Sequence, residues 1–182
     1  MISFFRRALS GSLISLAMSC LPAPAATVDT TFDVTITLNA ACEINGAFNG
    51  DALGAGDLDF GTHPATIVSD IDADNAGTPS AGIAVLCSDG LAYDVGLDQG
   101  LNENLGVRRM AGTSDFVEYE LYQDAARTTP WGDLASGDEL SATGNGLRQT
   151  YTVYGRVPAG QAPVLVAPPE TFTDTITVTV EF

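Results

Sequence analysis

The closing stretch of the sequence, FTDTITVTVEF (172–182), has the pattern that decides the fold. Its apolar row consists of Ile176, Val178, Val180 and Phe182, and threonines occupy the alternate positions. Strict alternation of this kind predicts a β-strand whose apolar face lies on a protein core. The sequence ends there, with no turn and no partner strand after it. Because an open apolar strand edge invites pairing with another chain, we expect a further element to cover this edge.

Earlier parts of the chain repeat the strand pattern. Expected strands fall at residues 32–38, 58–61, 82–87, 93–97, 117–122 and 150–157. Glycine-rich polar stretches at 45–57 and 136–146 are typical of surface loops, and the prolines between 158 and 169 predict a long extended loop. No window has sustained helical periodicity. Many short strands separated by turn residues predict a single all-β domain, an antiparallel sandwich.

The first 25 residues have the features of a secretory signal peptide. Arg6 and Arg7 precede a short apolar stretch, and Ala23 and Ala25 form a cleavage motif. A transmembrane anchor is the alternative, but the apolar stretch is shorter than the roughly 20 residues of a spanning helix. Cys20 suggests a lipoprotein, although the residues before it are a poor lipidation context. Cleavage after Ala25 would leave residues 26–182, the size of one domain.

The exported chain would be strongly acidic. All seven basic residues are arginines, and two of them leave with the signal peptide, so five arginines face 23 acidic residues for a formal charge of 5 − 23 = −18. Phosphate binding requires clustered basic residues, so nucleic acid and anionic lipid are not expected partners. The acidity is typical of a soluble exported protein.

Two cysteines, Cys42 and Cys87, remain after the cleavage. Two cysteines in an exported chain most often form one disulfide. Cys42 follows the expected first strand and Cys87 ends the stretch GIAVLC, so we predict a bond between adjacent strands. A catalytic thiol and a metal pair are the alternatives, but zinc would need further ligands that this chain lacks.

Candidate catalytic and metal-binding residues are few. His63 is the single histidine, and it lies in a turn-like context where an exposed structural role is expected. Asp70, Asp72 and Asp74 have the spacing of a calcium loop but lack its glycine and glutamate, which favours a solvated acidic loop. Trp131 and the tyrosines could line a carbohydrate site, but core positions are expected. The sequence therefore predicts neither an enzyme nor a cofactor.

Six stretches in order are similar to the spore-coat-U domain family, which includes the major subunits of archaic chaperone–usher pili. They are FDVTITLNAACEING (32–46), LDFG (58–61), GIAVLCSDG (82–90), YELYQDAARTTPWG (119–132), YGRVPAGQ (154–161) and FTDTITVTVEF (172–182). The resemblance spans nearly the whole exported chain, and the ordered set is more specific than any single stretch.

The resemblance implies an immunoglobulin-like sandwich without its last strand, in which residues 172–182 border an open groove. A periplasmic chaperone would fill the groove first, an outer-membrane usher would export the subunit, and the N-terminal extension of the next subunit would then replace the chaperone. The implied location is the periplasm during assembly and then a surface pilus that supports adhesion and biofilm formation. No membrane insertion is expected once the signal peptide is cleaved.

The expected donor residues are Phe32, Val34, Ile36 and Leu38, within an extension at 26–38 that precedes a sandwich domain at 39–182. An ordinary first strand packed in its own domain is the alternative interpretation of this segment. Two other functions remain open, namely a minor, adaptor or tip binding subunit and a small secreted carbohydrate-active sandwich.

Overall fold

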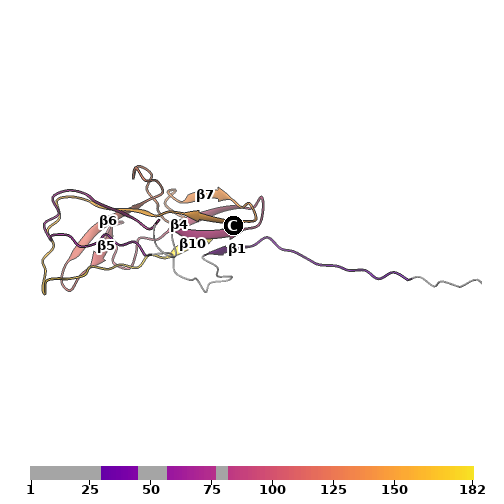
Figure 1. The fold of residues 1–182 in the computed structure, drawn as a ribbon, viewed down its shortest axis with the longest axis horizontal. Helices are drawn as coiled ribbons and strands as arrows, with labels where there is room; N and C mark the ends of the chain where they lie inside the picture. Colours follow the sequence, from indigo (N-terminus) through magenta and orange to yellow (C-terminus); the bar gives the residue numbers. More distant parts are fainter. Residues whose placement is uncertain (1–29, 45–56, 77–81) are drawn as a thin grey trace, which may run out of the picture. The chain divides into compact units, whose positions relative to one another are not determined.

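The computed structural model describes residues 30–44, 57–76 and 82–182. The chain divides into two units, Met1–Thr37 and Leu38–Phe182. In the first unit, residues 30–37 run as an extended chain without strand pairing (Figure 1). The expected strand at 32–38 is therefore not formed in this structure. The expected signal peptide lies outside the described residues.

The second unit contains the folded domain. Its described residues form ten strands: β1 (Cys42–Ile44), β2 (Ile71–Asp74), β3 (Ile83–Cys87), β4 (Ala92–Leu97), β5 (Arg108–Ala111), β6 (Phe116–Tyr122), β7 (Leu140–Thr143), β8 (Arg148–Tyr151), β9 (Tyr154–Val157) and β10 (Val178–Glu181). No helix in the described part of the chain is long and apolar enough to cross a bilayer.

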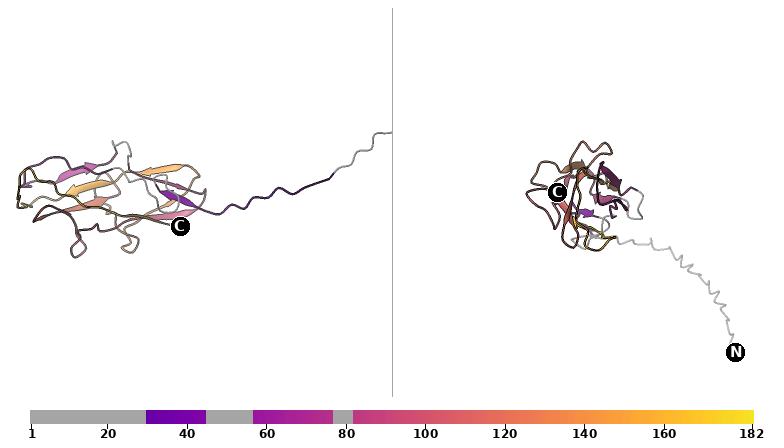
Figure 2. Two further views of the ribbon diagram at one scale, coloured as in Figure 1. Left: turned by 90° about the horizontal axis from the view of Figure 1, so that it is seen from below. Right: turned by 90° about the vertical axis from the view of Figure 1, so that its left-hand side faces the viewer.

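All of these strands pair antiparallel, in three sheets with the orders β1-β3-β8, β10-β4-β7 and β2-β9-β6-β5. Views along two further directions show the strands arranged around a common interior (Figure 2). The all-β prediction is confirmed, and the arrangement agrees with an immunoglobulin-like sandwich.

The core receives the alternate residues of the central strands. Ile83 and Val85 of β3, Val95 and Leu97 of β4, and Leu121 of β6 are buried in one hydrophobic cluster. Alternation along each strand sends every second side chain inward, which is why short apolar–polar patterns suffice to build this interior. Trp131 lies at the centre with 0% exposure, and its indole nitrogen donates to the carbonyl of Val95 at 2.8 Å.

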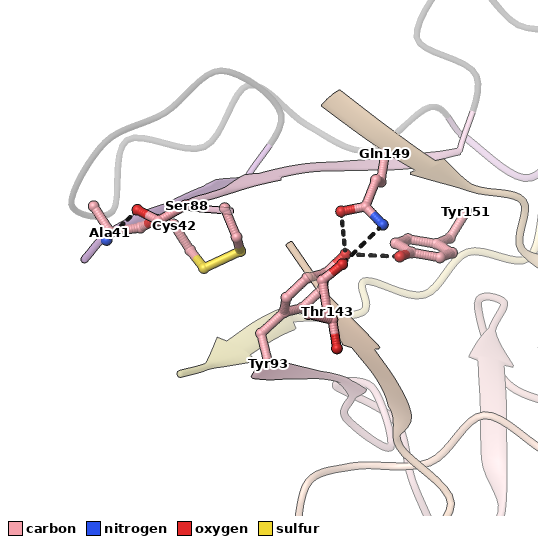
Figure 3. Close-up of a disulfide and its surroundings, with 8 residues drawn as sticks. Ala41, Cys42, Ser88, Tyr93, Thr143, Gln149 and Tyr151 are labelled. Carbon is pink, nitrogen blue, oxygen red and sulfur yellow. Dashed lines mark hydrogen bonds between the residues drawn. A yellow bond between two sulfur atoms is a disulfide. The ribbon is translucent and has the colours of Figure 1, made fainter. Parts of the chain in front are cut away.

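The predicted disulfide between Cys42 and Cys87 is confirmed (Figure 3). The two residues are directly opposite each other in the β1–β3 pair, as expected for a bond between adjacent strands. Beside it, the Ser88 hydroxyl accepts a hydrogen bond from the Ala41 amide at 3.1 Å. The disulfide therefore fixes the start of β1 against the centre of its sheet.

Several strand predictions need correction. The stretch 58–61 forms no strand, and 150–157 is divided into β8 and β9 by Thr152 and Val153. The loop predicted at 136–146 contains β7, and the expected acidic loop at Asp70–Asp74 is largely β2. The acidic stretch can form β2 because one of its charges is paired across the sheet. The Arg156 guanidinium donates to both carboxylate oxygens of Asp72, at 2.7 and 2.9 Å, across the β2–β9 pair.

Candidate functional site: an apolar groove beside the last strand

A groove of about 820 Å³ opens beside the C-terminal segment of the folded domain. Its base consists of core residues from three strands, including Ile83, Leu97 and Leu121. Its sides come from two segments without regular strand pairing, one with Leu58 and Phe60 and the other with Phe172 and Ile176. The groove is therefore an extension of the core that is open to the surface.

Two strand edges border this groove. In the order β10-β4-β7, β10 is an edge strand, and in the order β1-β3-β8, β1 is an edge strand. Val178 of β10 and Ile44 of β1 both line the groove. An edge strand has backbone N–H and C=O groups directed away from its own sheet, so an extended chain in the groove could form main-chain hydrogen bonds there.

The segment before β10 is paired on one side. The backbone of Thr173 exchanges hydrogen bonds with Ala111 at 2.8 and 3.0 Å. The Thr177 amide donates a hydrogen bond to the Asp98 carboxylate at 2.9 Å. Phe172, Ile176 and Val178 are half-buried on one face, while the threonines between them are exposed. The alternation read from the sequence is thus present, although regular strand pairing starts only at Val178.

Tyr119 of β6 connects the two sides of the groove. Its ring lies 6.3 Å from that of Phe60 in an edge-to-face arrangement, and its hydroxyl donates to the Asp174 carboxylate at 2.7 Å. Burial, followed by the hydrogen bond to Asp174, raises the pKa of Tyr119, so the phenol remains protonated. Asp174 also accepts hydrogen bonds from the Leu101 amide and the Asn102 side chain, both at 3.0 Å. This carboxylate is the polar point in an otherwise apolar row.

Gly155 of β9 permits the close approach of the other side. A Cβ atom at this position would lie 2.5 Å from Leu58 and 2.7 Å from Phe60. Any larger residue would displace these two side chains. The stretch LDFG therefore packs as irregular chain over a glycine, where the sequence had predicted a strand.

The four residues of the predicted C-terminal row differ in where their side chains lie. Ile176 and Val178 line the groove, and Val180 packs against the core. Phe182 is 60% exposed, so its predicted core position is wrong. It lies beyond the last residue of β10, where strand pairing no longer directs its side chain inward.

The predicted donor residues are exposed. Phe32 and Val34 are 84% exposed, and Ile36 and Leu38 are 81% exposed. Four large apolar side chains at every second position are costly to leave in water. The sequence signal for the groove residues Leu58, Phe60, Met110 and Phe172 was weaker, because their contribution depends on which segments the fold brings together.

The other candidate residues have structural roles. Hydrogen bonding from Arg156 lowers the pKa of Asp72, which also lies 3.3 Å from Arg127. His63 is exposed and donates to the carbonyl of Phe60 at 2.7 Å. No cluster of metal-ligating side chains occurs among residues 30–44, 57–76 and 82–182. Since Trp131 is buried, the carbohydrate alternative loses its central stacking residue.

The comparisons with known proteins agree with the sequence resemblance. The Spore Coat Protein U domain matches residues 28–179, and the chain belongs to this family, a structural rather than an enzymatic one. "Protein U" of Myxococcus xanthus is 36% identical over 170 residues, which cover 88% of each chain.

A solved structure is also similar, the CsuC–CsuE chaperone–tip adhesion subunit pre-assembly complex from archaic chaperone–usher Csu pili of Acinetobacter baumannii. The identity is 27% and the TM-score is 0.49. The match covers 80% of this chain and 40% of the solved chain.

Proposed function

We propose that this protein is a structural subunit of a surface pilus assembled by the chaperone–usher pathway through donor-strand exchange. One observation carries the proposal: the same chain has an apolar groove along a strand edge that pairs with no other described strand, and an exposed segment with apolar residues at every second position. The groove would receive Phe32, Val34, Ile36 and Leu38 of a neighbouring copy. Main-chain hydrogen bonds to β10 would provide affinity, and the alternate side chains would provide specificity.

The groove and the donor segment are different surfaces, so the contact between two copies is head-to-tail. Head-to-tail contacts produce an open fibre unless the rotation between copies closes a ring. A chain that can both give and accept a strand fits a repeating position within the fibre. An adaptor or tip role, and the support of adhesion and biofilm formation, are finer alternatives within the same proposal.

Membership of the family supports the assembly partners of the proposal. A periplasmic chaperone would occupy the groove before assembly, and an outer-membrane usher would pass the subunit to the surface. Without a chaperone, a groove continuous with the core would lead to aggregation, because burying apolar surface lowers the free energy by about 25 cal/mol per Å².

Deletion of Val28–Leu38 tests the proposal. The mature chain, 26–182, should form fibres in electron micrographs, whereas the deletion variant should not. A synthetic peptide of residues 28–38 should still bind the deletion variant, because its groove is intact. Fibres formed by the deletion variant would contradict the proposal, as would a failure of the peptide to bind a folded deletion variant.

A further inference from the structure

The charged side chains that line the groove are all acidic among the described residues. Asp57, Asp59 and Asp174 line it, and no arginine, lysine or histidine does so among the described residues. Asp57 and Asp59 are exposed, while Asp174 is half-buried. Asp98 lies next to the same segment, where its carboxylate binds Thr177. An occupant of the groove therefore meets carboxylates on the Leu58 side and on the Ile176 side.

A buried cation near the groove does not reverse this sign. Arg108 donates to the backbone carbonyls of Leu97 and Asp98, both at 2.8 Å, and to that of Trp131 at 2.9 Å. It is 2% exposed and does not line the groove. These five described groups, namely the carboxylates of Asp57, Asp59, Asp98 and Asp174 and the guanidinium of Arg108, have a formal charge of 1 − 4 = −3.

The proposed donor segment has the same sign. Residues 26–38 contain Asp29 and Asp33 and no basic residue. Asp33 is exposed and lies between Phe32 and Val34 of the apolar row. If this row enters the groove, Asp33 lies on the other face of the donor strand and brings a further negative charge to a groove that is already lined by three carboxylates. Repulsion between like charges acts over a Debye length of about 8 Å at physiological salt and about 30 Å at 0.01 M.

We infer that the charge of the groove disfavours the chain's own donor segment and favours an apolar strand with basic residues. This inference rests on the proposed function. Burial of apolar side chains favours binding of either strand in the groove, whereas charge determines how fast each strand enters. A basic strand is attracted at low salt. The acidic donor is repelled, and added salt removes much of this repulsion. Low ionic strength would therefore favour a cationic partner in the groove, and higher ionic strength would favour the donor segment of a second copy of this chain.

The test measures the assembly rate of the mature chain by light scattering between 20 and 300 mM NaCl. We expect the rate to rise by roughly tenfold over this range. Asp33→Lys should assemble faster than the parent at 20 mM and should slow as salt is added, which reverses the sign of the dependence. The matched control is Asp138→Lys, an exposed residue that does not line the groove. This control changes the net charge equally and should keep the salt dependence of the parent.

The outcomes separate the inference from the proposed function. A parent rate that is constant or falls with salt would overturn the inference, as would equal salt dependences for Asp33→Lys and Asp138→Lys. If no fibre forms at any salt concentration, the proposed fibre is wrong. The inference is then tested with fluorescent peptides of residues 28–38, using the natural sequence and one with Asp29→Lys and Asp33→Lys. The inference fails if, at 20 mM NaCl, the cationic peptide binds the mature chain no more tightly than the natural peptide does.

Discussion

A charge placed in the donor row should abolish assembly, whereas the same charge one residue further on should not. Ile36→Asp changes a side chain that is 81% exposed here and that docking would bury. Loss of the buried isoleucine removes about 1.5–3 kcal/mol of binding free energy. Protonating the aspartate at pH 7 so that it can enter an apolar site adds up to about 4 kcal/mol, at 1.36 kcal/mol per pKa unit. The combined loss reaches roughly 5.5–7 kcal/mol, which weakens the contact by about 10⁴- to 10⁵-fold.

The matched control is Thr37→Asp. Thr37 belongs to the other row, so its carboxylate would remain in water and weaken the contact by less than about tenfold. The assay measures fibre yield by electron microscopy and by sedimentation of the mature chain. The donor row would be wrongly assigned if Ile36→Asp assembled as well as the parent, or if Thr37→Asp failed as completely as Ile36→Asp.

Three other predictions concern the folded domain. Removal of the disulfide by Cys42→Ala with Cys87→Ala should lower the free energy of unfolding by about 4 kcal/mol, because the bond closes a separation of 45 residues; unchanged urea unfolding would contradict this. Gly155→Val should lower the unfolding midpoint by displacing Leu58 and Phe60, and it should reduce binding of the donor peptide, whereas an unchanged midpoint and affinity would show that the close contact is unimportant. Because the pKa of Asp72 is lowered in the folded state, its ion pair stabilises the fold above about pH 4, and this contribution is lost as pH falls below that value. Asp72→Asn should therefore remove this part of the pH dependence of stability in urea titrations from pH 7 to 2. An unchanged pH profile in this variant would contradict the prediction.

The sequence predicted the parts of the fold that depend on local alternation. β3, β4 and β6 lie where their apolar rows placed them, because each buries alternate residues in a common core. β2 and β7 were missed because they carry polar residues, and β2 depends on the cross-strand pair of Asp72 and Arg156. Such a pair becomes visible only when the sheet order is known.

The groove could be predicted only as a consequence of the family resemblance. The row Ile176 and Val178 is evident in the sequence, but the closure of the groove by Leu58 and Phe60 depends on Gly155, a residue almost 100 positions away. Phe182 continues the alternation yet is exposed, since the strand ends at Glu181. Periodicity therefore predicts which side faces inward within a strand, but not where the strand ends.

Photo-crosslinking would show whether residues 28–38 of one copy fill the groove of another copy. A photoreactive phenylalanine analogue would replace Phe32 in isotopically labelled chains, which would then be assembled with unlabelled wild-type chains. We expect crosslinks that join labelled to unlabelled chains and map to groove residues such as Ile176 and Val178. Crosslinks confined to a single chain, or placed outside the groove, would contradict it.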